Sequence, residues 1–272
     1  MSSDSFFVLG DCQDPGYRNV RDLPHYREAR DFTESLWRRY RGYEDEHFLQ
    51  EAKDHFLERF WEMYLAVAFL ERGFELSRAG NAGPEFCFTS GNRKIWVEAV
   101  APGPGEGNDR VPELQMGPEV ASKVPTEKIL LRYTNAIVEK RKQYVAALER
   151  GTLDESDAYV LAINSRRISH APFGNTLPFF VQALLPFGPP TILIDRKTGE
   201  FGERFYQLRE SVTKAKGSAV STASFLDPQF AFVSAVLHSS VDCANRPSRL
   251  GGEFIILHNP SASRSLDRSV FD

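Results

Sequence analysis

The sequence predicts an α/β protein with one mixed β-sheet, and three observations support this fold class. Two long segments, 44–72 and 126–150, carry apolar residues at helical spacing. Between them lie two short segments joined by a turn dipeptide, which is typical of a β-hairpin. Short apolar runs such as AYVLAI at 158–163 then indicate buried strands. This order of elements favours a single sheet with helices packed against it.

Length and charge exclude several classes of protein. The chain has 272 residues, 33 of them basic and 37 acidic, which gives a formal net charge of −4. The excess of acidic residues excludes a protein coated in basic side chains for non-specific nucleic-acid binding, although local basic faces stay open. Three scattered cysteines argue against a disulfide framework and against a zinc site. Because we find no membrane-spanning segment and no signal-peptide pattern, we expect a cytoplasmic protein without membrane contacts.

The first 55 residues predict an N-terminal helical arm. Residues 1–25 are interrupted by proline and glycine and are expected to be irregular, and residues 28–40 predict a short helix. A long helix is expected over 44–72, where the second half is apolar on every side and should therefore be buried. Gly73 would end this helix as a C-cap residue.

Short strands and a second long helix are expected next. A strand-like patch at 74–76 precedes two strands at 85–89 and 94–100, which Gly91-Asn92 would join as a two-residue hairpin turn. Residues 102–125 are rich in glycine and proline and predict a long loop. The following helix, over 126–150, would begin at a Thr126 cap and end before Gly151. Buried strands are then expected at 158–163, 191–194, 231–237 and 254–258.

The hairpin turn determines which side chains face each other. With Gly91-Asn92 as the turn, Phe86 faces Val97 and Glu85 faces Glu98. Because side chains alternate along a strand, the two acids share the face opposite the apolar residues. Two like charges placed in this way are unfavourable unless something offsets them, as a bound divalent cation would. The alternatives are a register that differs by one residue, or carboxylates that point into solvent.

The two long helices each place a charged side chain on an apolar face. Lys140 falls on the apolar stripe of the helix 126–150, with Arg132 and Gln143 close to the same face. A lysine at this position either has an anionic partner or extends its ammonium to solvent. Glu62 lies among apolar residues of the helix 44–72, where it is either partnered or on a wetted helix face.

These residues, taken in order, resemble the PD-(D/E)XK, or restriction-endonuclease-like, nuclease superfamily. The motifs are Glu62 on a helix, Gly83-Pro84-Glu85 at the start of one strand, and WVEAV at 96–100 in the next. The match is to uncharacterised bacterial members and covers roughly 56–164. It implies a restriction-endonuclease-like core, with a central mixed β-sheet flanked by helices, over 56–195. The remaining residues, 196–272, would be a C-terminal extension packed on the same sheet or completing it.

The resemblance implies a nuclease that hydrolyses phosphodiester bonds of DNA with the help of Mg²⁺ or Mn²⁺. The metal would activate water for attack on the phosphate. Glu85, Glu98 and the backbone carbonyl of Ala99 would hold the metal. Together with Glu62 and Lys140, the two strand carboxylates would form the catalytic group.

Two positions depart from the family pattern. Glu85 stands where the family usually has aspartate, and its side chain is one methylene longer. Val100 stands at the position of the family's lysine, and valine can neither orient water nor neutralise charge. Either Lys140 supplies the missing amine from the next helix, or the protein is a degenerate nuclease-like module that binds nucleic acid or a protein without cutting.

The helix 126–150 is also the candidate surface for nucleic acid. It carries six basic and three acidic residues, a local charge of +3. Contacts to phosphates depend on such local positive charge. Arg132, Lys142 and Gln143 are the expected nucleic-acid-binding residues, and the sequence leaves a homodimer open.

Overall fold

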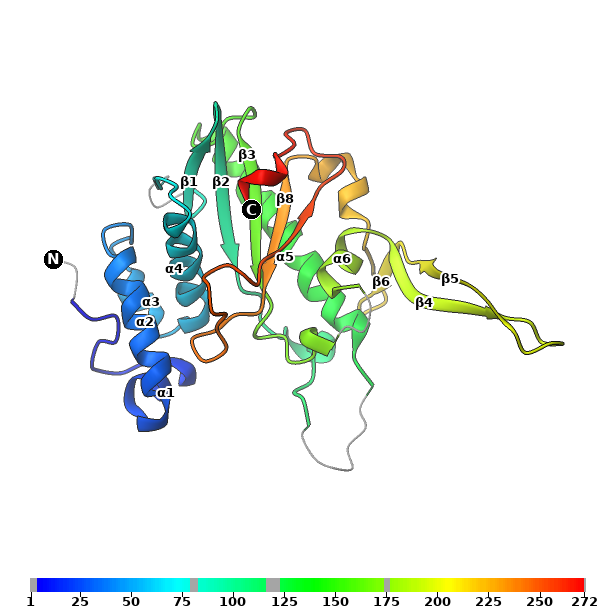
Figure 1. Cartoon of the computed structure of the whole chain (residues 1–272), viewed down its shortest axis with the longest axis horizontal. Coiled ribbons are helices and arrows are strands. Elements are labelled where there is room, and N and C mark those ends of the chain that lie inside the picture. The colour runs from blue at the N-terminus through cyan, green and yellow to red at the C-terminus, as the bar shows by residue number, and fades with distance from the viewer. Residues whose placement is uncertain (1–3, 79–82, 116–122, 174–176, 272) are drawn as a thin grey trace.

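The computed structural model describes residues 4–78, 83–115, 123–173 and 177–271. A five-stranded mixed sheet lies at the centre of these residues, with helices on both of its faces (Figure 1). The predicted mixed α/β architecture is therefore confirmed. Within the described ranges, every helix is too short or too polar to cross a membrane.

The central sheet combines the predicted hairpin with strands from later in the chain. Its strands are β1 (Phe86–Ser90), β2 (Arg93–Val100), β3 (Ala158–Asn164), β8 (Ala235–Ser239) and β9 (Ile255–His258). They lie in the order β1-β2-β3-β8-β9. The three inner strands are parallel, and each edge strand is antiparallel to its neighbour. The segment after residue 195 thus supplies two of the five strands.

The β1–β2 hairpin has the predicted register. Phe86 pairs with Val97, and Gly91 has the positive φ of 60° that suits a tight hairpin turn. β1 begins one residue later than expected, so Glu85 lies immediately before the strand. The strand expected at 74–76 is wrong, because these described residues lack strand structure.

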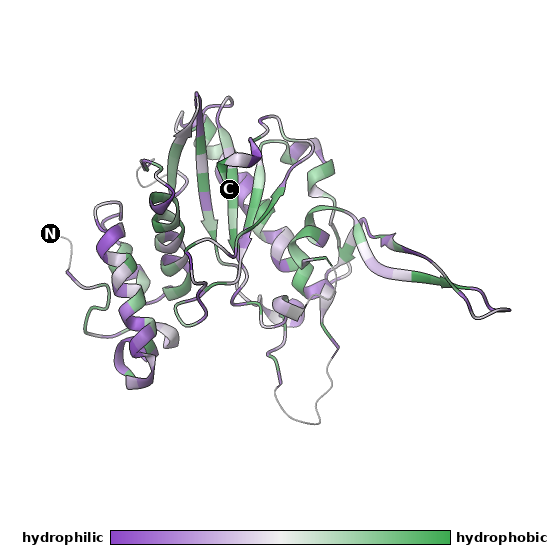
Figure 2. Ribbon diagram, in the orientation of Figure 1, coloured by the Kyte–Doolittle hydropathy of each residue, from purple (hydrophilic) through white to green (hydrophobic). Residues whose placement is uncertain are grey.

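Helix α4 (Phe56–Glu71) covers one face of the sheet. It is buried along most of its length, as predicted, and Figure 2 shows it as strongly apolar. Its side chains share one core with inward-facing residues of the sheet such as Val97 and Val160. The indole N–H of Trp61 donates to the carbonyl of Ala162 in β3 at 3.0 Å, which fixes the helix against the strand.

The prediction of a single long helix over 44–72 is wrong for the first part of this segment. The chain forms a short α3 (Phe48–Ala52), leaves the helix, and starts again at Phe56. Asp14 explains the break, because its carboxylate accepts the N–H of Phe56 at 3.1 Å. The N–H of Asp14 also donates to the carbonyl of Lys53 at 3.0 Å. A residue 42 positions earlier therefore caps a new helix here.

Two further helices form a layer outside α4 (Figure 1). These are α1 (Pro15–Asp22) and α2 (Arg27–Tyr40), and α2 confirms the helix expected over 28–40. The prediction that residues 1–25 are irregular is wrong for the residues that form α1. Asp14 caps this helix too, since its carboxylate accepts the N–H of Gly16 at 2.7 Å.

Helix α5 (Thr126–Glu149) covers the opposite face of the sheet and confirms the helix expected over 126–150. Its apolar side chains pack with Leu161 and Tyr159 of β3. Gly151 follows the helix with a φ of 70°, as expected for a C-terminal glycine. The expected Thr126 cap is wrong, because Thr126 is already helical and its side chain does not cap the helix.

The second half of the chain adds small elements around this core. They are α6 (Phe179–Leu184), β4 (Phe187–Ile194), β5 (Phe201–Leu208), β6 (Ser211–Thr213) and β7 (Ala219–Ser221). Short 3₁₀ helices occur at Pro24–Tyr26, Gly107–Asp109, Ala171–Phe173, Ser224–Leu226, Pro228–Phe230 and Arg268–Val270.

Two of the later strand predictions need correction. A strand does cover 191–194, but it is exposed, because within the described residues β4 pairs with β5 alone and the two strands project from the body (Figure 1). The strand expected at 231–237 begins only at Ala235, since a 3₁₀ helix and a turn precede it. The strand expected at 254–258 is confirmed by β9.

Candidate functional site

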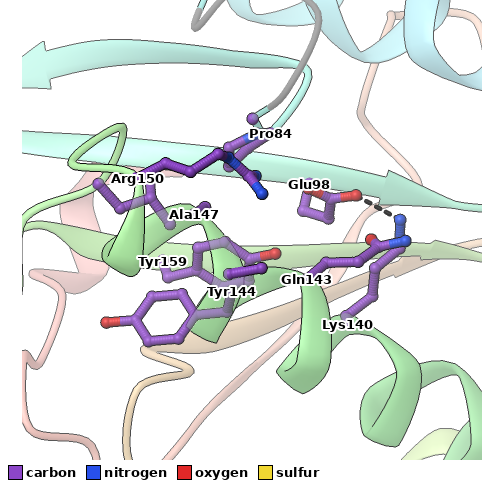
Figure 3. A pocket seen from close by; sticks show the side chains of 11 residues that line it. Pro84, Glu98, Lys140, Gln143, Tyr144, Ala147, Arg150 and Tyr159 are labelled. Atoms are coloured by element: carbon purple, nitrogen blue, oxygen red, sulfur yellow. Dashed lines mark hydrogen bonds and ion pairs between the residues drawn. The ribbon is translucent and has the colours of Figure 1, made fainter.

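Glu98 and Lys140 form a buried ion pair between the sheet and α5 (Figure 3). Glu98 lies on β2, on the face that α5 covers, and is only 6 % exposed. The Lys140 ammonium donates directly to its carboxylate. The lysine on the apolar stripe of α5 therefore has an anionic partner, which is one of the two options that the sequence left open.

Glu85 brings a second carboxylate to this place. Continuing the β1–β2 register by one pair places Glu85 opposite Glu98. Burial raises the pKa of Glu85 well above its ordinary value, and the nearby charges of Glu62 and Glu98 raise it further. Burial also raises the pKa of Glu98, although Lys140 opposes the shift. The site thus holds more negative charge than one lysine offsets, so it favours an additional cation or a proton.

Glu62 lies within electrostatic reach of this pair but has its own partners. It is 2 % exposed, and its carboxylate accepts the Tyr40 hydroxyl at 2.6 Å. The guanidinium of Arg59 and that of Arg78 donate to the same carboxylate. Both oxygens of Glu62 are therefore hydrogen-bonded, and the burial of this acid is explained by two arginines and a tyrosine.

A first cavity, of about 340 Å³, opens beside the ion pair. Figure 3 shows Gln143, Tyr144 and Tyr159 around it, with Glu98 and Lys140 on one side. The hydroxyl of Tyr159 is buried close to the Glu98 carboxylate. Burial, and then the Glu98 charge, raise the pKa of Tyr159 well above its usual range.

A second cavity, of about 750 Å³, lies on the other side of Lys140. Val100 contributes to its wall together with the loop that follows β2. Its charged lining is mainly positive: Arg110, Arg132, Lys140, Arg167 and Lys214 against Glu106, Asp109 and Glu139. Because Lys140 lines both cavities, the Glu98–Lys140 pair lies between them.

Arg132 lies against the loop that lines the second cavity. Gly105, with a φ of 88°, allows this approach, because a Cβ there would come within 2.2 Å of the Arg132 guanidinium. Burial lowers the pKa of Arg132, and its Nε has no hydrogen-bond partner among the described residues. A guanidinium held in this way is suited to an anionic ligand.

The structure separates the other residues that the sequence singled out. Gln143 lines the first cavity and Arg132 the second. Lys142 lines neither; it is exposed and pairs with Glu139 at 2.7 Å. Ala99 pairs with Ala162 of β3, with its side chain in the core on the α4 side.

Several residues of the two cavities were not predicted from the sequence. Tyr159 lies in an apolar strand segment, and its hydroxyl is the one feature of the sequence there that indicates a polar role. Arg167 and Lys214 come from loops without periodicity and reach the second cavity through the tertiary fold alone. Arg110 lies in the glycine- and proline-rich segment, whose composition predicts a loop and nothing more specific.

The donor chemistry of the site fits a hard divalent cation. Mg²⁺ in proteins commonly takes one or two carboxylates and completes its shell with water and phosphate oxygens. Glu85 and Glu98 offer such a pair with excess negative charge, Glu98 buried and Glu85 half-buried. Within the described ranges, no three His, Cys, Asp or Glu side chains converge on one point.

Comparison with known proteins found no family model, no curated protein and no solved structure that matches the chain.

Proposed function

We propose that the protein is a metal-dependent nuclease that hydrolyses phosphodiester bonds of DNA. The observation that carries the proposal is the buried contact of Lys140 with Glu98, beside Val100. Val100 occupies the position where the resembled nuclease superfamily has its lysine. An amine from α5 supplies the charge that valine lacks, next to the second carboxylate of the motif.

We also propose that the sheet and its helices form a restriction-endonuclease-like core. Three features of the topology support this assignment. An antiparallel hairpin, β1–β2, follows a buried helix, α4. A crossover helix, α5, then leads to β3, which is parallel to β2. The two helices cover opposite faces of the sheet.

Different side chains of the site would have different roles in metal-dependent phosphodiester hydrolysis. Glu85, Glu98 and the carbonyl of Ala99 would hold Mg²⁺ or Mn²⁺, which when bound lowers the pKa of a water molecule and neutralises phosphate charge. Lys140 orients the Glu98 carboxylate and presents an ammonium to a phosphate oxygen. The Tyr159 hydroxyl lies close to the Glu98 carboxylate in the wall of the first cavity, where it can help to hold that carboxylate in place.

The second cavity provides the electrostatic surface for a DNA backbone. Five basic side chains line it against three acidic ones. Lys140 pairs with Glu98, Arg110 with Glu113 and Arg167 with Glu58, and Arg132 and Lys214 complete the basic set. Phosphate contacts of this kind supply most of the sequence-independent affinity of DNA-binding proteins. The overall charge of −4 therefore coexists with a local positive surface beside the carboxylates.

One observation favours the alternative of a module that binds without cutting. Lys140 already neutralises Glu98, and valine at position 100 supplies no second amine beside it. If the Glu98–Lys140 pair has only a structural role, the protein keeps its charged cavities for binding but does not hydrolyse nucleic acid.

A cleavage assay separates the two functions. The wild-type protein should cut DNA with Mg²⁺ or Mn²⁺ and lose this activity in a chelator. Lys140→Ala should cut about 10²-fold more slowly or worse, because an ammonium near the reacting phosphate is removed. Lys216→Ala, at an exposed lysine in the β6–β7 turn, is the matched control and should cut normally. Absence of cleavage by the wild-type protein on both DNA and RNA would reject the nuclease function, and cleavage of RNA alone would reject DNA as the substrate.

Arg132→Ala tests the proposed DNA surface. We expect weaker binding to duplex DNA and a salt dependence, log K against log salt, that is shallower by about 0.9, which corresponds to one lost phosphate contact. Fluorescence anisotropy over a salt series measures both quantities. Arg38→Ala, at an exposed arginine of α2, should leave the slope unchanged. An unchanged slope for Arg132→Ala would remove this residue from the DNA surface.

A further inference from the structure

The β4–β5 hairpin (residues 187–208, the ribbon) exposes a large apolar surface to solvent. It projects from the body of the protein (Figure 1), and within the described residues it forms a sheet of two strands only. Eight of its large apolar side chains are exposed, including Phe201 at 76 % and Leu208 at 72 %. An isolated two-stranded hairpin is marginally stable in water. The ribbon thus lacks a partner that would cover it.

Most of this apolar surface lies on one face of the ribbon. Directly paired residues of a hairpin share a face, and side chains alternate along each strand. The pairs Pro190–Tyr206 and Ile192–Arg204 fall on one face, and Leu208 on β5 and Ile194 on β4 follow on that face by alternation. Their partners Phe187 and Phe201 each lie beyond a one-residue register shift and join the same face through their pairing. The exposed apolar residues of this face are Phe187, Ile192, Ile194, Phe201, Tyr206 and Leu208. Arg204 is the charged exception, and its long side chain can reach solvent past its neighbours.

The charge of the ribbon favours a protein partner over nucleic acid. Residues 187–208 contain three basic and three acidic side chains, so their net charge is zero. A polyanion such as DNA is bound mainly through positive charge, which the ribbon does not have in excess. An exposed, contiguous apolar patch instead marks a protein contact.

The area and shape of the apolar face suit a second copy of the same chain. From their exposed fractions, its six apolar side chains offer about 700 Å² per copy, close to the ~800 Å² per partner of a stable protein interface. A two-fold axis would place this face against its own copy, as in most homodimers. Pro189 and Pro190 remove two N–H donors from β4, which disfavours growth of the sheet at this edge and favours packing face to face.

We propose that the protein forms a homodimer in which the apolar faces of two ribbons pack against each other. The two ribbons then form a small four-stranded sandwich, and their apolar side chains leave water. This proposal does not depend on the nuclease function, because the ribbon contributes no residue to either cavity.

Sedimentation equilibrium or light scattering of the full chain tests the dimer. The wild-type protein should have twice the 30.8 kDa mass of the chain over a concentration series. The double substitution Phe201→Asp/Leu208→Asp should give the monomer mass, with an unchanged circular dichroism spectrum because both side chains lie outside the core. Leu9→Asp is the matched control, since Leu9 is 83 % exposed but lies outside the ribbon, and it should stay dimeric.

A second variant shows whether loss of the dimer could result from local misfolding of the substituted ribbon. Replacing residues 191–205 by a short glycine-serine turn removes the apolar tip, and Pro190 and Tyr206 are already paired at the new junction. This variant should also be monomeric. A monomeric wild type, open-ended aggregates without a discrete dimer, or a dimer that persists in both ribbon variants would overturn the proposal.

Discussion

Replacing Glu62 with alanine should lower the free energy of unfolding by about 3 to 5 kcal/mol, the largest stability effect expected in this protein. The substitution removes the buried carboxylate that Arg59 and Arg78 share and leaves the Tyr40 hydroxyl without its acceptor. Among the described residues, the two arginines keep only the more exposed carboxylates of Asp45 and Glu51. Charged groups that lose a buried partner cost far more than an exposed pair contributes. Denaturant unfolding followed by circular dichroism measures the loss.

Glu71→Ala is the matched control for this prediction. Glu71 is on the same helix and also pairs with an arginine, Arg39, but both side chains are about 40 % exposed. Exposed pairs typically contribute about 1 kcal/mol or less, so this variant should stay near wild type. A loss below about 1 kcal/mol for Glu62→Ala would mean that Asp45 and Glu51 suffice to neutralise the two arginines, and would contradict a structural role for the Glu62 carboxylate.

Replacing Glu98 with glutamine should reduce metal-dependent DNA cleavage by about 10²-fold or more. Glutamine keeps the size of the side chain but removes the charge that contacts Lys140 and that a divalent cation requires. Single-turnover cleavage of a labelled duplex, with Mn²⁺ in excess, measures this effect.

Controls separate this loss from a folding defect. Glu149→Gln changes an exposed glutamate at the end of α5 and should cleave at the wild-type rate. The unfolding midpoint of Glu98→Gln shows whether the variant is folded at the assay temperature. A folded Glu98→Gln protein that cuts as fast as wild type would place the active site elsewhere.

The sequence was sufficient where the determining interactions are local. The hairpin register follows from one turn dipeptide and the alternation of side chains, so the pairs from Phe86–Val97 to the turn could be predicted. The inward position of Lys140 follows in the same way from helical periodicity. Neither of these inferences needs knowledge of the tertiary fold.

Other features depend on residues far apart in the chain and could not be predicted from local patterns. The break between α3 and α4 is made by Asp14, which no periodicity links to Phe56. The basic lining of the second cavity includes Lys214, whose place beside Lys140 exists only in the folded chain.

The β4–β5 ribbon shows a different reason for an incorrect prediction. Its run Thr191–Ile194 has the composition of a buried strand, yet the run lies in solvent in the single chain. An apolar composition indicates that a strand is buried, but it does not show whether the same chain or a second chain buries it. A second copy of the ribbon would reconcile the composition with the exposure.

A crystal of the wild-type protein soaked in Mn²⁺ tests the proposed metal site most directly. Anomalous scattering locates manganese without reference to catalysis. We expect one strong peak between the carboxylates of Glu85 and Glu98, and no peak there in Glu98→Gln crystals treated in the same way. A wild-type crystal with Glu98 still paired to Lys140 and no manganese at these carboxylates would contradict the metal-dependent nuclease.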